Sequence, residues 1–250
     1  MAVGSTTLLM LAMLTGVAAA APKHLAPIRI IHMNKGAVTS GNWSGYASTG
    51  TTFKSVKGTW TQPSIDCSVA PNGAVAFWVG LDGFTSGTVE QDGTIAFCTN
   101  GTAKYFDWWE MYPANAVQVV HTINPGDKFT SSVQFTGGQY ILKVTDTTNS
   151  AASFSTTQSC QGTCSRSSAE WITEAPCCVG SGFFPLPNFN SIKFTSAATA
   201  NDAGHKGPIN DPSWTATSIT MVNGSGQTKV STSALNAAGN SFTNRWVRAS

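Results

Sequence analysis

Charged residues are scarce in this 250-residue chain, because Asp, Glu, Lys and Arg together make up only 10% of it, where about 25% is usual. They are also unevenly placed, since residues 1–37 hold three of the fourteen basic residues and none of the twelve acidic ones. The rest of the chain has eleven basic and twelve acidic residues, a formal charge of −1. Without a basic patch, neither nucleic acid nor an anionic membrane is expected as a partner.

The common hydrolase signatures are missing too. The chain has no Gly-x-Ser-x-Gly, no Asp-Thr-Gly or Asp-Ser-Gly and no His-Glu-x-x-His. Beyond the N-terminal arm the only histidines are His121 and His205, and a serine or cysteine nucleophile would need one of them as its base. His121 shares one face of a strand-like run with Val117, Val119 and Ile123, which favours a packed structural role, and His205 lies in a polar loop. Histidine-dependent catalysis is therefore poorly supported.

Helical periodicity is absent, because no window of eleven or more residues has apolar positions at helical spacing without a Gly, Pro or Ser-Thr cluster. Instead, short runs of β-branched and aromatic residues alternate with turn residues, which predicts an all-β sandwich. Strands are expected over residues 43–47, 53–61, 74–81, 88–97, 104–112, 117–123, 128–135, 140–145, 152–157, 169–174, 191–197, 215–221, 228–233 and 241–247. Residues 197–213 are expected to form a long loop.

The N-terminus has the pattern of an export signal. Residues 1–21 contain an apolar run that ends in small residues, and the run is shorter than the ~20 residues that span a bilayer, so it is interpreted as a signal peptide. Residues 22–37 are interpreted as a basic propeptide or leader arm, with an ordered strand through residues 28–32 as the alternative. Residues 38–250 are expected to form one secreted, extracellular and monomeric domain, away from the membrane once the signal is removed.

Six cysteines follow the signal, and export to an oxidising compartment favours disulfides between them. Cys67 with Cys98 and Cys160 with Cys164 are plausible pairs, while the adjacent Cys177 and Cys178 would form a strained bridge. The alternative is a zinc site built from the last four cysteines, although their spacing suits zinc poorly.

Aromatic residues and carboxylates concentrate in three segments, residues 76–83, 105–113 and 168–176. Within a strand Glu170 and Glu174 share one face, so that both can line one groove. The alternative is that Glu170 is an ordinary polar residue facing water.

Five motifs decide between these possibilities. In chain order they are Asn-Trp-Ser-Gly-Tyr (42–46), Phe-Trp-Val-Gly-Leu-Asp-Gly (77–83), Val-Glu-Gln-Asp-Gly-Thr (89–94), Trp-Trp-Glu-Met-Tyr-Pro (108–113) and Ala-Glu-Trp-Ile-Thr-Glu (169–174). With these motifs the sequence resembles the glutamic peptidases, or eqolisins, and its bacterial branch in particular. The resemblance covers most of residues 38–250.

The resemblance implies a concanavalin-like β-sandwich of two antiparallel sheets, with a substrate groove on the curved sheet. By position, Gln91 matches the catalytic glutamine and Glu170 the catalytic glutamate. The residues that match groove-lining or supporting positions are Trp43, Trp78, Asp82, Glu110 and Glu174. The implied protein is a secreted acid endopeptidase that acts on polypeptides without metal or cofactor and is insensitive to pepstatin. Glu170 would activate a water and Gln91 would stabilise the oxyanion.

One position departs from the family pattern: four residues beyond Gln91, where Asp is frequent, the chain has Ile95. Asp92 could compensate only if the strand were irregular, because alternation points it to the opposite face. Two other functions stay open on the residues alone. One is a carbohydrate hydrolase with Glu110 and Glu170 as its two carboxylates, and the other is a carbohydrate-binding module with a tryptophan platform.

Overall fold

The computed structural model describes residues 30–34, 37–119, 121–179 and 182–250. Side chains are described from residue 38 onward, except at 120 and 178–181. The expected signal peptide lies outside these residues, so its boundary and that of the arm stay predictions. Within the arm, the backbone of β1 (Ile30–Asn34) pairs antiparallel with β2 (Ala37–Ser40), close to the strand that the alternative placed at residues 28–32. The described part of the chain contains no helix long and apolar enough to cross a membrane.

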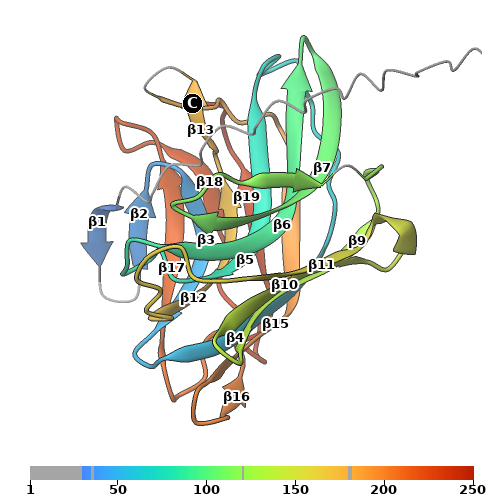
Figure 1. Cartoon of the computed structure of the whole chain (residues 1–250). Coiled ribbons are helices and arrows are strands. Elements are labelled where there is room, and N and C mark those ends of the chain that lie inside the picture. The colour runs from blue at the N-terminus through green and yellow to red at the C-terminus, as the bar shows by residue number, and fades with distance from the viewer. Residues whose placement is uncertain (1–29, 35–36, 120, 180–181) are drawn as a thin grey trace, which may run out of the picture.

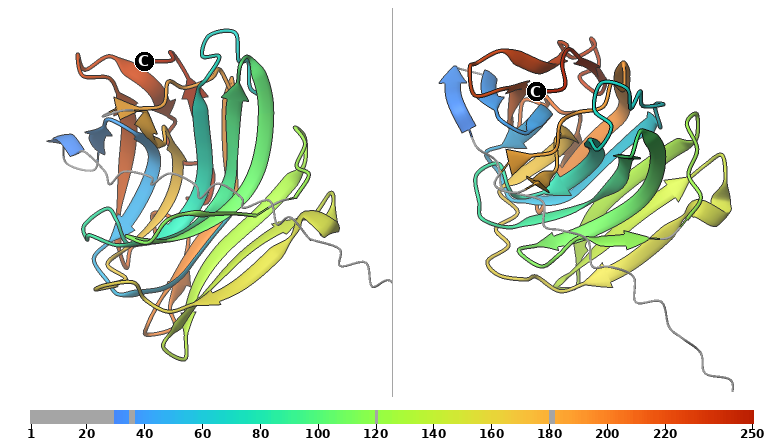
Figure 2. Two further views of the ribbon diagram at one scale, coloured as in Figure 1. Left: turned by 45° about the horizontal axis from the view of Figure 1, so that its top comes forward. Right: turned by 90° about the horizontal axis from the view of Figure 1, so that it is seen from above.

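The first sheet carries the candidate catalytic residues, and Figures 1 and 2 show its strands arching across the molecule. In hydrogen-bonded order after β1 and β2 it contains β17 (Thr215–Val222), β3 (Trp43–Thr49), β12 (Ser168–Glu174), β5 (Ala74–Leu81), β6 (Val89–Thr99), β7 (Thr102–Tyr112) and β8 (Val117–Val119). From β17 the sheet also continues through β18 (Thr228–Thr232) to β19 (Phe242–Trp246). These pairings are antiparallel except for β2 with β17.

The second sheet lies against the first. Its order is β11 (Phe154–Gln158), β10 (Gln139–Asp146), β9 (Lys128–Thr136), β4 (Phe53–Thr61), β15 (Ser191–Asn201) and β16 (Lys206–Gly207). β15 belongs to both sheets, because its first residues pair with β19 and its later residues pair with β4. A 3-10 turn, η1 (Ser150–Ala152), and the hairpin of β13 (Cys177–Val179) and β14 (Gly182–Phe183) complete the described elements. The all-β sandwich is confirmed.

The main core fills the space between the two sheets. Large side chains from both sheets are buried there, including Phe53, Trp60, Phe77, Phe129, Tyr140 and Trp171. Burying each such side chain stabilises the fold by about 1.5–3 kcal/mol. Trp171 also donates its indole N–H to the Lys57 carbonyl at 2.8 Å, which fixes β12 against β4. The alternation of β12 then directs Glu170, on the other side of the strand, away from this core.

β3 and β12 approach each other closely at Gly45. A Cβ added there would lie 2.0 Å from the Trp171 carbonyl oxygen, and the residue has φ +145°. Only glycine tolerates both conditions, so the Asn-Trp-Ser-Gly-Tyr motif places its glycine where the central pair of strands requires one.

Two local predictions were wrong. The expected loop at 197–213 begins as a strand, since β15 continues to Asn201 and pairs with both β4 and β16. Its small residues hid the alternation of buried and exposed positions. The run 117–123 is a strand only over Val117–Val119, and Val117 is 39% exposed rather than packed with His121. His121 instead places Nδ1 at 2.7 Å from an Asp107 carboxylate oxygen, a structural contact of a different kind.

The disulfides match the two plausible pairs: Cys67 with Cys98 and Cys160 with Cys164. Cys177 is disulfide-bonded as well, while the side chain of Cys178 lies outside the described residues. The Cys160–Cys164 bridge uses two of the four sulfurs that the zinc alternative required, so that alternative is wrong.

Candidate active site

Four neighbouring strands place the two predicted catalytic residues in one row. The register pairs Glu170 of β12 with Gly80 of β5, Gly80 with Gln91 of β6, and Gln91 with Glu110 of β7. Residues that are directly opposite in a sheet point to the same face. Glu170, Gln91 and Glu110 therefore share the face that lies away from the main core, which we call the site face.

Gly80 leaves a gap in this row. Adjacent strands lie about 4.8 Å apart, so the backbones of Glu170 and Gln91, two strands apart, are separated by about 10 Å. Glycine at position 80 puts no side chain of its own between them, and the edge of the Trp78 ring lies over this position, with Cζ3 2.9 Å from where a Cβ would be.

Two further rows complete the site face. The second row contains Trp78 and Ile172, and the third contains Trp43 and Glu174. Trp43, Trp78 and Ile172 belong to a second hydrophobic cluster, distinct from the main core. Trp43 and Trp78 meet edge to face with ring centroids 4.7 Å apart.

The residue that departs from the family pattern, Ile95, is buried in this second cluster as well, at 6% exposure. An apolar side chain there cannot replace the hydrogen bond of an aspartate. Asp92 does not compensate, because it points into the main core and accepts a hydrogen bond from Ser131, as a regular strand requires.

Glu110 holds the side chain of Gln91. The Gln91 amide nitrogen donates to a Glu110 carboxylate oxygen at 2.5 Å, and this contact fixes which end of the amide faces β7. The second N–H of the amide is left to donate elsewhere. Desolvation raises the pKa of Glu110 to about 8, and the hydrogen bond from Gln91 partly opposes this rise.

Glu170 is a buried carboxyl group without a bonded partner. It is 0% exposed, so the alternative in which it faces water is wrong. Neither of its carboxylate oxygens has a hydrogen-bond partner among the described residues. Desolvation raises its pKa well above the ordinary value, with added repulsion from Asp82 and Glu90, while the nearby Ser168 hydroxyl acts in the opposite direction. An unpartnered carboxyl group in such a place is typical of a functional site.

Glu174 is, by contrast, bonded on both oxygens. It accepts from the Trp78 indole at 2.9 Å and from the Asn42 amide at 3.4 Å. Desolvation, with repulsion from Glu110, raises its pKa well above the ordinary value. Its contacts hold Trp78 in place beside the gap, which is a supporting role.

Asp82 supports the site from the end of β5 rather than from the site face. Its carboxylate accepts hydrogen bonds from the backbone N–H groups of Arg166 and Ser167 and from the Ser86 and Ser167 hydroxyls. These bonds join the turn after β5 to the turn that leads into β12. Asp82 thus fixes the entry to the strand that carries Glu170.

The resemblance alone did not single out Glu90. The Glu90 side chain points to the opposite face from Gln91 and is 0% exposed. Neither of its carboxylate oxygens has a hydrogen-bond partner among the described residues. Desolvation, with repulsion from Asp82, raises its pKa to about 9. Strand alternation could have revealed it, because a site-facing Gln91 requires its neighbours to face the core.

We expect Gly80→Ala to lower kcat/KM for peptide hydrolysis at least tenfold. The new methyl group would lie 2.9 Å from Trp78 Cζ3 and 3.1 Å from Gln91 Cβ, closer than packed carbon atoms allow, so both side chains must move. Gly87→Ala is the matched control, because nothing lies within 4 Å of a Cβ at that position. Kinetics and melting temperatures of both variants test this, and equal activity would contradict the role of Gly80 in placing Trp78 and Gln91.

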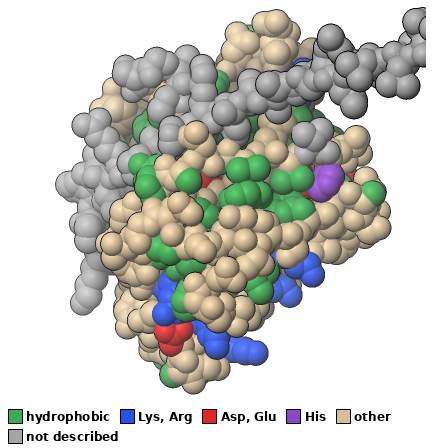
Figure 3. Space-filling view, viewed as in Figure 1, with side chains coloured by type: hydrophobic (Ala, Val, Ile, Leu, Met, Phe, Trp, Pro, Cys, Tyr) green, Lys and Arg blue, Asp and Glu red, His purple; other side chains and the backbone are tan. Residues whose placement is uncertain are grey.

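Few acidic side chains are visible on the face in Figure 3, where tan atoms, which belong to other side chains and to the backbone, predominate. The buried carboxyl groups account for part of this. Seven of the twelve acidic residues, Asp82, Glu90, Asp92, Asp107, Glu110, Glu170 and Glu174, are buried around the site strands. The acidic chemistry of the chain is thus concentrated at and behind the site face.

Comparisons with known proteins agree with this geometry. The model of the Peptidase A4 family matches residues 41–243. Aspergillopepsin-2 from Aspergillus niger is 26% identical over 193 residues, which cover 68% of this chain and 67% of the relative.

Solved structures are similar over most of the domain. Scytalido-glutamic peptidase with a peptide-based transition-state analogue has a TM-score of 0.71 at 25% identity, covering 83% of this chain and 98% of that one. Aspergilloglutamic peptidase from Aspergillus niger has a TM-score of 0.60 at 27% identity, covering 70% of this chain and 99% of that one. The expectation of a bacterial branch stays a prediction.

Proposed function

The chain belongs to the peptidase A4 family, and on this premise we propose that it is a glutamic endopeptidase in which Glu170 and Gln91 form the catalytic pair. The observation that carries the assignment is the row Glu170, Gly80, Gln91, which holds a carboxyl group and an amide on one face across a gap. A peptide bond placed in the gap has a base on one side and a hydrogen-bond donor on the other.

Glu170 is the general base and then the general acid. Its ionised form takes a proton from a water as the water attacks the peptide carbonyl carbon, and it delivers that proton to the leaving amine nitrogen. Because burial raises its pKa, Glu170 is ionised in only a small fraction of molecules in acid, but that fraction is a stronger base for the first step. The leaving nitrogen is more basic still, so that it takes the proton in the second step. The reaction needs no covalent intermediate, since one water is consumed for each peptide bond that is cleaved.

Gln91 stabilises the oxyanion. When the water adds, the carbonyl oxygen gains negative charge, and the N–H of Gln91 that Glu110 does not bind is available to donate to it. Glu110 is a positioning residue, because it acts through the orientation of the amide. Trp78, Trp43 and Glu174 frame the gap, and we propose that they contact the polypeptide substrate.

We expect Gln91→Ala to lower kcat/KM by about 10²–10³, the usual cost of removing one oxyanion donor. The loss should appear mainly in kcat, since the donor acts on the transition state. Gln91→Glu is a useful companion, because it keeps the size of the side chain but puts a carboxylate where the oxyanion forms. Activity within a few-fold of wild type in both variants would refute this role.

The reaction class is tested by digestion of an acid-denatured protein in mild acid, with pepstatin and a chelator present. Cleavage under these conditions is expected. If the protein were inert on polypeptides but cleaved or bound a polysaccharide, the proposal would fail in favour of a carbohydrate function.

We also propose that the protein is exported and acts outside the cell. Disulfides join Cys67 to Cys98 and Cys160 to Cys164, and such bridges persist in oxidising compartments. Expression with residues 1–21 attached, followed by N-terminal sequencing of the protein in the medium, tests both export and the boundary of the arm.

A further inference from the structure

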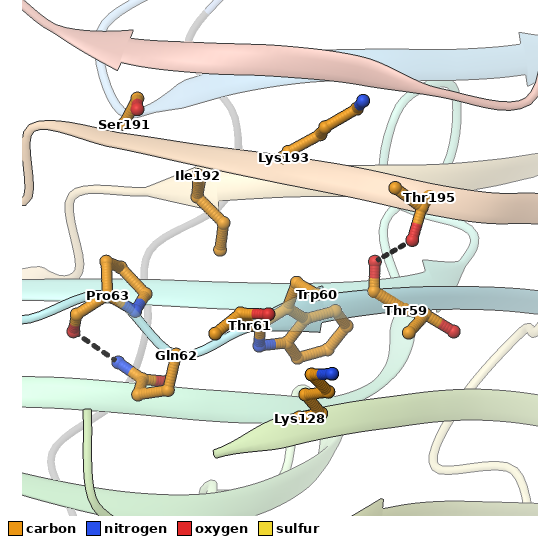
Figure 4. Close-up of a pocket in the computed structure, with 10 residues that line it drawn as sticks. All are labelled: Thr59, Trp60, Thr61, Gln62, Pro63, Lys128, Ser191, Ile192, Lys193 and Thr195. Carbon is orange, nitrogen blue, oxygen red and sulfur yellow. Dashed lines mark hydrogen bonds between the residues drawn. The ribbon is translucent and has the colours of Figure 1, made fainter. Parts of the chain in front are cut away.

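A cavity lies between β4 and β15, on the part of the chain that joins the two sheets. It encloses about 470 Å³ and is lined by Thr59, Trp60, Thr61, Gln62, Pro63, Lys128, Ser191, Ile192, Lys193 and Thr195. Figure 4 shows Ile192 pointing from β15 toward β4, with Lys193 and Lys128 on opposite sides of the cavity. None of the catalytic candidates lines this cavity, so it is a separate site.

The cavity exists because the two strands separate. β4 and β15 pair as far as Thr59 with Thr195, and the preceding residues of β15 pair with β19 instead. The backbone N–H and C=O of Gln62 bond to Asp127 and Gly126, on the β9 side. Since backbone groups alternate along a strand, those of Thr61 point to the opposite side, toward β15 and the cavity. The cavity is thus bordered by a short open strand edge.

One wall carries a buried polar atom without a partner. Gln62 is 1% exposed, and its amide nitrogen donates to the Pro63 carbonyl at 3.3 Å. This contact fixes the orientation of the amide, and the amide oxygen is left with no partner among the described residues. A buried acceptor of this kind is costly unless a ligand or water donates to it.

The charge of the cavity is positive. Its ten lining residues include two lysines and no carboxylate. The ion pairs among the described side chains involve His121, Arg166 and His205, so neither Lys128 nor Lys193 is neutralised by a neighbour. The acidic residue next to Lys128, Asp127, is buried and accepts the N–H of Asn124 at 2.7 Å.

We propose that this cavity is a second peptide-binding site, which takes an extended acidic segment of a polypeptide. The open edge at Thr61 offers one donor and one acceptor, as an added strand requires. A peptide N–H would satisfy the Gln62 oxygen, and carboxylates would meet Lys128 and Lys193. The basic arm of this chain does not fit, because residues 22–37 contain no acidic residue.

The inference rests on the proposed function in one respect: the ligand would be a second stretch of the polypeptide that is cleaved at the site face. Trp60 links the two sites physically. Its ring lines the cavity, and its indole N–H donates to the Thr94 hydroxyl of β6 at 3.1 Å, three residues from Gln91. The cavity would therefore favour substrates with an acidic segment at a distance from the cleaved bond.

Direct binding tests the site without requiring turnover. The probe is a fluorescein-labelled, end-blocked hexapeptide of alternating glutamate and valine at pH 6, checked by mass spectrometry to be intact, and anisotropy reports the Kd. Lys128→Glu/Lys193→Glu is expected to weaken binding at least tenfold. Lys57→Glu/Lys143→Glu, which changes two exposed lysines outside the cavity, should alter Kd less than twofold. The same peptide with glutamine in place of glutamate should bind wild type at least tenfold more weakly.

Equal weakening by both double variants would overturn the proposal in favour of general surface charge. Binding of dextran sulfate through Lys128 and Lys193, without binding of the peptide, would overturn it in favour of a polysaccharide. Hydrolysis separates this inference from the proposed function: the cavity double variant should raise KM for a substrate with an acidic tail and leave an untailed substrate unchanged. If no substrate is hydrolysed but the peptide binds as expected, only the proposed function fails.

Discussion

Replacing Glu170 by glutamine is expected to lower kcat/KM for peptide hydrolysis by about 10⁴, the upper range for loss of a general acid–base group. The amide cannot take a proton from water, and nothing on the site face replaces it, because Glu110 is bound to Gln91 and Glu174 to Trp78 and Asn42. The fold should survive, since glutamine has nearly the same shape. Steady-state kinetics with a quenched peptide substrate, together with circular dichroism, measures both effects.

Glu90→Gln is the matched control for this variant. It makes the same chemical change at a carboxyl group that is equally buried but lies on the opposite face of β6. Its activity in acid should stay within a few-fold of wild type. If both variants lost activity equally, the loss would reflect buried carboxyl groups in general rather than catalysis by Glu170.

The second large effect concerns stability against pH: the fold is expected to be most stable in acid and to weaken as the pH rises. The pKa is raised to about 9 for Glu90 and to about 8 for Glu110, from an ordinary value of 4.5. The pKa values of Asp92, Glu170 and Glu174 are also raised, and desolvation is the largest cause in each case. Between the ordinary and the raised pKa the folded protein binds more protons than the unfolded chain, so that the free energy of unfolding falls with rising pH.

The pH range over which stability is lost follows from the raised pKa values of Glu90 and Glu110. The contribution of Glu90 is fully present below about pH 4.5 and is lost progressively up to about pH 9, and that of Glu110 is lost up to about pH 8. At about 1.4 kcal/mol per pKa unit, Glu90 alone accounts for up to about 6 kcal/mol. Even a third of this is a large part of a total stability of about 5–15 kcal/mol. Greater stability in acid would suit a peptidase that cleaves its substrates in acid.

Urea unfolding at pH 4 and pH 7 measures this effect, with a lower midpoint expected at pH 7. Glu90→Gln should raise the midpoint at pH 7 and reduce the difference between the two pH values. Asp66→Asn is the control, because Asp66 is exposed and hydrogen bonds from Ser68 lower the pKa of its carboxyl group instead of raising it. A wild-type midpoint that is the same at both pH values would contradict the prediction.

Much of the site could be predicted from the sequence because a strand has a short, rigid period. Alternation alone puts Glu170 and Glu174 on one face and Asp92 on the other, and the structure confirms both. The same rule breaks down where a strand ends or bends. His121 lies beyond the end of β8, where its position is set by Asp107, and residues 197–201 extend β15 because β4 and β16 offer partners on both sides.

By itself, the sequence determined the class of fold and the family, because these depend on residue type, order and local period. It also predicted the catalytic pair and made two disulfide pairs plausible without deciding between the possible connectivities. The tertiary structure decided which side chains meet. Glu170, Gly80, Gln91 and Glu110 form one row only because four strands align in one register, and burial of their carboxyl groups follows from the packing of whole sheets. The lysine cavity between β4 and β15 likewise arises where two strands separate, which no local pattern records. The register of the strands, the burial of the carboxyl groups and the separation of β4 from β15 are long-range properties. They are set by the free energy of the assembled fold rather than by any single segment.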